Sequence, residues 1–292
     1  MELWSEMQRF EISPDVYTYS ILINGVCRNR RTDEGHRLFE EMKKEGIMPN
    51  SVTFNGLIHG YCKQGLMEEA LAISSEMTGR GIQPNAVTFS SLIDGYCKAG
   101  KMDAAMGLFS EMIIKGIAPD VVTYSVLIDG HFKNWNTKGA LRLHSEMLEA
   151  GVNQNVFTVC SLIDGLCKDG RIADAVKLFL ETVGVDNEVT GCSPNHVLYT
   201  SIIQGLCNDG RMFIASKFFS DMRRRGVRPD AITYGTLVRG HCHVKHLHSV
   251  ALLHADMIKH GFTTDDEMHL SLLSCYQKFG TPRANFPRLS SC

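Results

Sequence analysis

The sequence has little that points to a membrane, a secretory route or a charged partner. It contains no apolar run near the roughly 18 residues that span a bilayer. Its first fifteen residues have neither a signal-peptide core nor the Arg- and Ser-rich character of an organellar leader. The 30 Lys and Arg residues nearly balance the 32 Asp and Glu residues, for a formal net charge of −2. We therefore expect no membrane association, and no partner held by net charge alone.

Catalytic and metal-binding motifs are also missing. There is no nucleophile elbow, phosphate-binding loop or catalytic carboxylate pair, and the tail at 281–292 lacks the H-x-E and C-x-x-C signature of a zinc deaminase. The stretch HCHVKHLH at 241–248 holds metal-ligating residue types, but they fall across a helix end, a turn and a helix start. We expect no enzyme activity, no cofactor, no metal and no small-molecule substrate.

The ten cysteines do not occur in close pairs. Equivalent sites of stacked helical units lie about a helix diameter apart, beyond the roughly 7 Å Cα separation that a disulfide tolerates. We interpret the recurring cysteines as small buried apolar residues in a reducing compartment. Those that recur at 35 residues or its multiples, allowing for one insertion, are Cys27, Cys62, Cys97, Cys167, Cys207 and Cys242.

What the sequence does contain is a repeated phrase, SLIDGYCKAG at 91–100 and SLIDGLCKDG at 161–170. Alignment on it divides most of the chain into repeats of 35 residues, of which the fifth has five extra. A repeat that covers nearly the whole chain predicts a solenoid. The seven repeats are 16–50, 51–85, 86–120, 121–155, 156–195, 196–230 and 231–265, with a partial repeat (second helix) at 1–15, another (first helix) at 266–280 and a tail at 281–292.

Each repeat predicts two amphipathic helices. In 86–120 the apolar residues recur at helical spacing, Gly100 follows as a left-handed cap, and a second apolar face begins at Met102. A glycine at the tenth position of every repeat costs helix propensity, which indicates that two helices approach closely there. Trp135 replaces the turn glycine of the fourth repeat, which predicts a looser turn. The expected fold class is all-α, a right-handed superhelical solenoid of helix-turn-helix repeats.

Three positions of the first helix, the second, fifth and thirteenth, lie on one face. The second is apolar, the fifth is small and mostly polar, and the thirteenth is mostly basic. Stacked repeats would align them as rows of apolar, hydrogen-bonding and cationic groups, which suits a single nucleic-acid strand. Simpler explanations exist, because basic residues favour helix C-termini, and the Asp or Asn that ends every repeat is a good N-cap.

The sequence resembles the pentatricopeptide repeat family, in its plain 35-residue class. The resemblance rests on VTYSVLIDGHFK at 122–133, the closing motifs GIMPN, GIQPN and GIAPD, and SEM or EEM late in the second helix. It implies that single-stranded RNA is bound at one base per repeat, 5′ to 3′ from the N-terminus, in organellar transcript stabilisation, processing or expression. It also implies a mitochondrial location, with a plastid as the second choice. The alternative is a helical-repeat scaffold for protein partners without RNA recognition.

The resemblance assigns roles to individual residues. The base-selecting pairs are Ser20 with Asn50, Asn55 with Asn85, Ser90 with Asp120, Ser125 with Asn155, Cys160 with Asn195, Thr200 with Asp230 and Gly235 with Asp265. The base-sandwiching residues are Tyr17, Val52, Val87, Val122, Phe157, Val197 and Ile232. The phosphate-contacting residues are Arg28, Lys63, Lys98, Lys133, Lys168 and Lys278. The implied footprint is 5′-A-Y-G-A-N-G-N-3′, in which the fifth and seventh pairs depart from the family pattern.

The two ends and the insertion carry further expectations. The chain starts in the middle of a repeat, so we interpret it as a fragment of a longer array. Leu3, Trp4 and Met7 would then form an uncapped apolar face, which predicts end-to-end self-association. The extra residues near 183–190 are expected to form a surface bulge.

Overall fold

The computed structural model describes residues 13–184, 195–264 and 266–279, and within the last helix the side chains of 268–275. These residues form fifteen helices and no strand. The expected all-α fold of repeated helical hairpins is therefore confirmed. The expectations for Leu3, Trp4 and Met7, most of the insertion, Asp265 and the tail lie outside the described residues, and so does the Lys278 side chain. None of the described helices is long and apolar enough to cross a bilayer.

Each hairpin consists of a first and a second helix. The first helices are α2 (Val16–Arg28), α4 (Ser51–Gln64), α6 (Ala86–Lys98), α8 (Val121–Lys133), α10 (Val156–Lys168), α13 (His196–Asn208) and α15 (Ala231–His243). The second helices are α3 (Thr32–Lys44), α5 (Met67–Gly79), α7 (Met102–Ile114), α9 (Thr137–Glu149), α11 (Ile172–Gly184), α14 (Met212–Arg224) and α16 (Leu247–Lys259). The helix α17 (Asp266–Phe279) follows the last hairpin.

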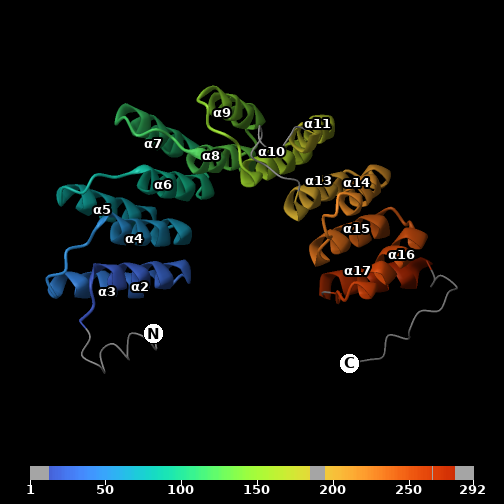
Figure 1. Ribbon diagram of the computed structural model, residues 1–292, viewed down its shortest axis with the longest axis horizontal. Helices are drawn as coiled ribbons and strands as arrows, with labels where there is room; N and C mark the ends of the chain where they lie inside the picture. Colours follow the sequence, from blue (N-terminus) through green and yellow to red (C-terminus); the bar gives the residue numbers. More distant parts are fainter. Residues whose placement is uncertain (1–12, 185–194, 265, 280–292) are drawn as a thin grey trace. The chain divides into compact units, whose positions relative to one another are not determined.

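The chain divides into two compact bodies, Met1–Val152 and Asn153–Cys292. Within the first body, α2, α4, α6 and α8 lie side by side in chain order, and each packs against its own second helix (Figure 1). Within the second body, α10, α13, α15 and α17 form the corresponding row (Figure 1). The first helices therefore make up one continuous layer in each body, and the right-handed superhelix stays a prediction.

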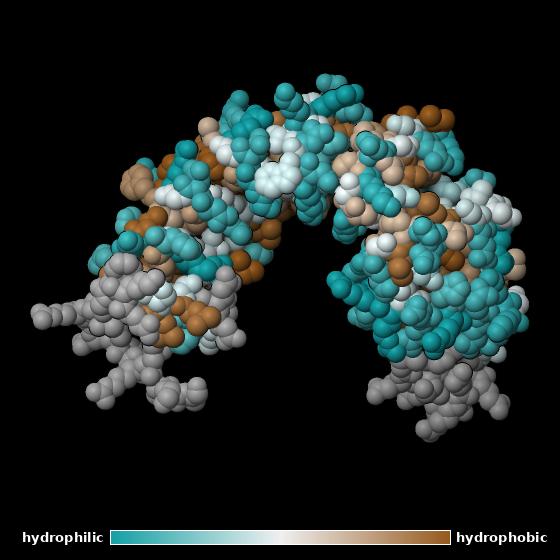
Figure 2. All heavy atoms as spheres, turned by 180° about the vertical axis from the view of Figure 1, so that it is seen from behind, coloured by the Kyte–Doolittle hydropathy of each residue, from teal (hydrophilic) through white to brown (hydrophobic). Residues whose placement is uncertain are grey.

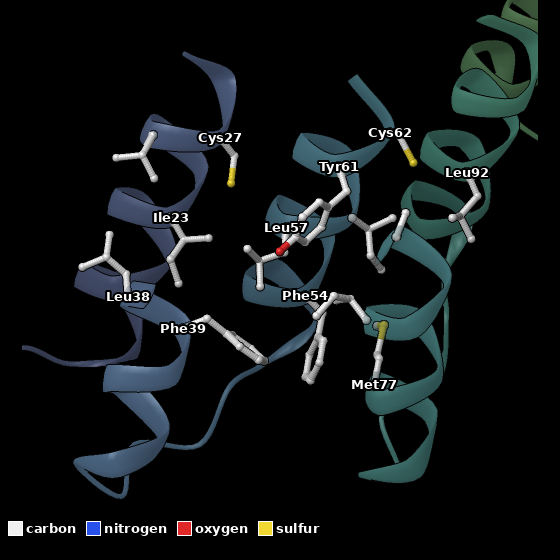
Figure 3. Packing of buried hydrophobic residues seen from close by; sticks show 14 of the residues in the cluster. Ile23, Cys27, Leu38, Phe39, Phe54, Leu57, Tyr61, Cys62, Met77 and Leu92 are labelled. Carbon is white, nitrogen blue, oxygen red and sulfur yellow. The ribbon is translucent and has the colours of Figure 1, made fainter. Parts of the chain in front are cut away.

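Aromatic pairs join several of the hairpins to the next one. Phe39 of α3 meets Phe54 of α4 edge to face, with ring centroids 5.2 Å apart (Figure 3). Phe109 and Tyr124 repeat this contact at 5.6 Å, also in the first body. In the second body the contact recurs between Phe179 and Tyr199 and between Phe219 and Tyr234. The apolar face that one hairpin leaves open is thus covered by the following hairpin, as a solenoid requires.

The turn of the fourth hairpin is not looser than the others. Trp135 adopts a left-handed φ of 58° and donates its backbone N–H to the Phe132 carbonyl at 3.0 Å. The glycine at this place in the third repeat, Gly100, has φ 71° and bonds the Cys97 carbonyl at 3.1 Å. Trp135 is 79% exposed. A bulky residue therefore tolerates the strained conformation because its side chain points into solvent.

The close approach expected at the tenth-position glycines is confirmed for Gly60, Gly95, Gly130, Gly205 and Gly240, whereas a Cβ added to Gly25 would meet nothing within 4 Å. A Cβ added to Gly130 would lie 2.6 Å from Cys97 Sγ and 2.8 Å from Cys97 Cβ. Gly60, Gly95 and Gly205 stand equally close to the cysteine of the preceding repeat. The described cysteines are free, and those of the first three repeats are buried, whereas Cys167, Cys207 and Cys242 are half-buried. Burial raises the pKa of Cys62 and Cys97 to about 12, so both are neutral thiols at physiological pH.

This contact predicts opposite effects for two glycine-to-alanine changes. Gly130→Ala should destabilise the protein by about 1 to 3 kcal/mol, because the new methyl group overlaps Cys97. Gly107→Ala is the control, since a Cβ there meets nothing within 4 Å, and it should stabilise by up to about 1 kcal/mol through helix propensity. Thermal unfolding followed by circular dichroism measures both, and equal midpoints for the two variants would contradict the close packing.

Candidate nucleic-acid interface

An apolar residue is exposed at the second position of every first helix from α2 to α15. The exposed fractions run from 43% at Val197 to 72% at Tyr17. Apolar residues also reach the surface elsewhere, in patches separated by polar ones (Figure 2), and an isolated exposed valine needs no explanation. The recurrence at a single position in seven repeats does need one. The members of this row are Tyr17, Val52, Val87, Val122, Phe157, Val197 and Ile232.

The fifth position of the same helices is polar and buried in most repeats. Ser20 is 4% exposed, Asn55 is 9% exposed and Thr200 is 9% exposed, and Ser90 and Ser125 are also buried. These side chains leave the helix one turn after the exposed apolar residue. In the first body a row of hydrogen-bonding groups therefore runs beside the apolar row, whereas in the second body the polar Thr200 lies between Cys160 and Gly235 in the order of the repeats.

The last residue of each described repeat caps the first helix of the next. Asp120 Oδ1 accepts the backbone N–H of Thr123 at 2.9 Å, and Asn195 Oδ1 accepts that of Leu198 at 3.0 Å. Such caps satisfy N–H groups that have no partner within the helix. The N-cap expectation is thereby confirmed, and the residues concerned are Asp15, Asn50, Asn85, Asp120, Asn155, Asn195 and Asp230.

The fifth residue and the last residue of one repeat meet where that repeat joins the next. In the second repeat, Asn55 Nδ2 donates to Asn85 Oδ1 at 3.2 Å. We call this place the junction of two repeats. The register of the repeat predicted this adjacency, although the two residues are 30 positions apart in the chain.

A third residue, which the sequence analysis did not single out, completes the junction. It is the threonine at the third position of the following repeat. Thr88 Oγ1 lies 2.7 Å from Asn55 Oδ1 and 3.2 Å from Asn85 Oδ1. Six of the seven repeats carry this threonine, so its recurrence was a visible signal. The hydroxyl was overlooked because a β-branched residue in a helical pattern suggests packing rather than hydrogen bonding.

Two junctions have a different composition. The fifth repeat combines Cys160 with Leu198 at the third position of the sixth repeat, and the Cys160 thiol hydrogen-bonds Ser201 instead. The seventh repeat combines Gly235 with Met268, whose sulfur would lie 3.9 Å from a Cβ added to the glycine. Where the fifth residue of a repeat is polar, the third residue of the following repeat is threonine. Where the fifth residue is Cys160 or Gly235, the third residue of the following repeat is apolar.

The caps leave one polar atom of each Asp or Asn facing outward. Helix N–H groups can only donate, so the oxygen Oδ1 must face the helix. No described residue hydrogen-bonds Oδ2 of Asp120 or Nδ2 of Asn85. An Asp at the junction consequently presents an acceptor, whereas an Asn presents a donor.

The basic row is less positive than its sequence implies. Lys98, Lys133 and Lys168 each pair with the aspartate one turn earlier in the helix, at 2.5, 2.5 and 2.7 Å. The partners Asp94, Asp129 and Asp164 belong to the repeated phrase itself, where D-x-x-x-K is an i,i+4 pair. Lys63 instead donates to the Arg28 carbonyl at 2.9 Å. Each ion pair is exposed, so it opens at little cost when a phosphate offers a better partner.

The histidine-rich stretch at 241–248 does not gather into a metal site. His241 contacts Ser216 at 3.2 Å, and its ring is tilted by 40° against that of His246, with ring centroids 5.6 Å apart. Across the described ranges, no three His, Cys, Asp or Glu side chains converge as metal ligands.

Comparisons with known proteins give the same repeat. A model of the PPR repeat family matches residues 1–28, 22–63, 49–98, 87–133, 119–168 and 194–243, and a PPR repeat model matches 157–184 and 232–262. No curated protein matches the chain.

Solved structures similar to this chain include two in which pentatricopeptide repeats are in complex with RNA. Pentatricopeptide repeat protein PPR10, a maize protein, in complex with an 18-nucleotide psaJ RNA element is 22% identical over 95% of this chain, with a TM-score of 0.59. The PPR domain of Arabidopsis thaliana protein-only RNase P 1 in complex with tRNA is 15% identical over 63% of this chain and 95% of that domain, with a TM-score of 0.52. At such identities the likeness shows the fold. The chain spans 45% of the length of PPR10.

The cap geometry predicts that the stability of the protein depends on the cap oxygen of Asp120 and not on its charge. Asp120→Asn keeps an oxygen for the Thr123 N–H, so the free energy of unfolding should change by less than about 0.5 kcal/mol. Asp120→Ala removes the cap and should cost about 1 kcal/mol. Denaturant titration distinguishes the two, and an asparagine variant as unstable as the alanine variant would contradict the cap.

Proposed function

Because the chain belongs to the pentatricopeptide repeat family, we propose that it binds single-stranded RNA and reads one base per repeat through the junctions. The RNA would run 5′ to 3′ from the first repeat to the seventh. Neighbouring apolar residues of the second-position row would hold each base by its two faces. The base-selecting pair would then meet the edge of that base.

The observation that carries this proposal is the placement of each polar pair beside an exposed apolar row. Packed helices lie about 8 to 10 Å apart. A flat base between two side chains needs about 7 to 8 Å, which is two carbon contacts of about 3.5 to 4.0 Å. One base therefore fits between Val52 and Val87, or between Val87 and Val122, with its edge toward a junction. Stacking of this kind is sequence-tolerant, so selectivity has to come from the polar pair.

The outward atom of the last residue supports a simple chemical rule. Guanine and uracil carry an N–H donor at the centre of the Watson–Crick edge, whereas adenine and cytosine carry an acceptor nitrogen there. The acceptor of Asp120 or Asp230 suits guanine or uracil. The donor of Asn50 or Asn85 suits adenine or cytosine. The family's pair of Asn with Asn admits both C and U, so the second base stays Y. The fifth residue would separate the two bases within each class by its size and its own hydrogen bonds.

The footprint that we propose is 5′-A-Y-G-A-N-G-N-3′. For its first, second, third and sixth bases, both residues of the selecting pair lie in the same body. These pairs are Ser20 with Asn50, Asn55 with Asn85, Ser90 with Asp120 and Thr200 with Asp230. The fourth base, from Ser125 with Asn155, is assigned from the sequence alone. The fifth pair, Cys160 with Asn195, and the seventh, Gly235 with Asp265, assign no base.

The biological role that we propose follows from RNA binding without catalysis. An array that covers a short transcript segment would stabilise it, direct its processing or control its expression in an organelle, the mitochondrion before the plastid. A scaffold that binds proteins would show no base preference and little salt dependence, so the experiments below separate the two functions.

Thr200→Asn should change the sixth base. Wild type should prefer G there, and the variant should prefer U, because the family pairs Asn with Asp for U and Asp230 remains the acceptor. The affinity for 5′-ACGAGGG-3′ and for its sixth-base U version, in unstructured flanks, measures the change, with about 1 to 3 kcal/mol of discrimination expected. The third base, read by Ser90 and Asp120, is the internal control and should stay G. If neither protein distinguishes the two RNAs while both are folded, base reading is wrong.

Removal of the paired aspartates should tighten RNA binding. Asp94→Asn, Asp129→Asn and Asp164→Asn together free three lysines and remove negative charge near the RNA backbone. A charge about 7 Å from a phosphate contributes about 0.5 kcal/mol in water before screening, so the triple variant should bind about fivefold more tightly at low salt. Fluorescence anisotropy over a salt series measures the affinities. Wild type itself should show a log–log salt slope that approaches about −4 if all six row cations contact phosphates.

The control has the same change of net charge on the second helices, through Glu69→Gln, Asp103→Asn and Glu149→Gln. It should bind RNA as wild type does, within about twofold, because screening weakens charges beyond about 10 Å. If both triple variants bound RNA equally more tightly than wild type, the gain would come from net charge and not from the freed lysines of the basic row.

A further inference from the structure

We propose that the third-position threonine of the following repeat is a positioning residue of each base-reading site. This inference rests on the proposed function and deepens it. The base-selecting unit is then a triad, made of the fifth residue, the last residue and the next threonine. Thr53, Thr88, Thr123 and Thr233 would hold the pairs of the first, second, third and sixth repeats.

In three junctions the threonine is the hydrogen-bonding link between the two selecting residues. Thr123 Oγ1 lies 2.8 Å from Ser90 Oγ and 2.9 Å from Asp120 Oδ1. Thr233 Oγ1 lies 2.8 Å from Thr200 Oγ1 and 2.7 Å from Asp230 Oδ1. In the first repeat, Thr53 is 3.0 Å from the Ser20 hydroxyl and 3.1 Å from the cap oxygen.

The second junction shows what the link does to an amide. A hydroxyl carries one proton. Because its contact with Asn55 Oδ1 is the shorter of the two, the Thr88 hydroxyl donates its hydrogen bond to that oxygen. That bond turns Asn55 Nδ2 toward Asn85 Oδ1, 3.2 Å away. The orientation of the Asn55 amide, and with it the pattern that a base would meet, is therefore set by a residue of the next repeat.

The threonine is buried, and in two junctions it also belongs to the cap, because Thr53 and Thr88 accept the backbone N–H groups of Asn50 and Asn85 at 3.4 and 3.1 Å. Thr53, Thr88, Thr123 and Thr233 are all 0% exposed. The cap oxygen of Asp230 already accepts the Thr233 backbone N–H at 2.8 Å, and Thr200 can donate to the His196 carbonyl at 2.7 Å. Loss of the Thr233 hydroxyl consequently leaves both neighbours with another partner. Thr123 and Thr233 form no capping box of the kind that Thr53 and Thr88 form, so helix capping does not account for their hydroxyls.

The two repeats whose base-selecting pairs are unusual also lack the threonine. Leu198 follows the pair of Cys160 with Asn195, and Met268 follows Gly235. Leu198 is fully buried and Met268 is 2% exposed, so both fill the space of the missing hydroxyl network. The triad is thus present or absent as a whole in the junctions within each body. The fifth and seventh repeats would hold a base by its faces without selecting it by hydrogen bonds.

The fifth repeat allows a gain-of-function test. The RNA 5′-ACGANGG-3′ with each base at the fifth position is measured against wild type, Cys160→Ser, and Cys160→Ser with Leu198→Thr. Wild type should bind the four RNAs within about twofold. The single variant should do nearly the same, since its serine lacks the link to Asn195. The double variant should prefer A by about three- to tenfold, the worth of a well-placed hydrogen bond.

Two results would overturn the inference. Either the single variant prefers A as strongly as the double variant, or the double variant is folded and selects no base while wild type selects G at the third and sixth positions. Failure of the proposed function looks different, because wild type would then discriminate at no position, and the triad would fall with it.

A second pair of variants keeps the inference testable if threonine is not tolerated in place of Leu198. Thr233→Val removes the hydroxyl at constant shape, and Thr233→Ser keeps it. The valine variant should lose about three- to tenfold of its preference for G at the sixth base, and the serine variant should retain that preference. The third base is the internal control in both. A valine variant that keeps its full sixth-base selectivity would overturn the positioning role, whereas a general loss of affinity with selectivity intact would assign Thr233 to stability.

Discussion

Successive first helices can lie side by side only because no side chain stands at their tenth position. The glycine there accepts the cysteine of the preceding repeat at a distance that any Cβ would violate, as Gly130 does with Cys97. This contact fixes the separation between neighbouring helices within a body. The spacing of the exposed apolar row and the meeting of polar groups at the junctions both depend on that separation. The geometry of the proposed RNA-binding face therefore depends on a packing constraint nearer the other end of the same helices.

The junctions combine two roles that a smaller side chain could not. Serine or threonine would cap a helix as well as Asp or Asn does, but a hydroxyl has a single terminal atom. Asp and Asn have two, so that one satisfies the helix N–H groups and the other faces outward. In Asp120 and Asp230 the outward atom is an acceptor, and in Asn85 it is a donor. The atom that we propose to select a base thus belongs to the same residue that caps the next helix.

The sequence was sufficient for the fold because its signals are local and repeated. Asn50, Gly65 and the apolar period between them define a helix, and recurrence every 35 residues defines the stack. The sequence also placed Val87 and Ser90 on one face of their helix, whereas the burial of Ser90 was not predicted.

Hydrogen bonds between repeats were harder to predict. The role of Thr88 depends on a partner 33 residues away, which no pattern within one repeat reveals. The pairing of Lys98 with Asp94 was visible as an i,i+4 motif but passed unnoticed in a row defined only by its cations. Residue type alone predicted a looser turn at Trp135. The turn has the same geometry as those with glycine, because the exposed Trp135 side chain tolerates a left-handed backbone conformation.

Selection of RNA from a random pool by the intact chain, followed by sequencing, tests the central claim most directly. If the junctions select bases, the enriched motif will carry information at its first four bases and its sixth, in the order A-Y-G-A-N-G-N, with flat composition at the fifth and seventh. Enrichment without a common motif would contradict base reading. A motif with its strongest preferences at the fifth and seventh bases would contradict the assignment of selectivity to the polar junctions.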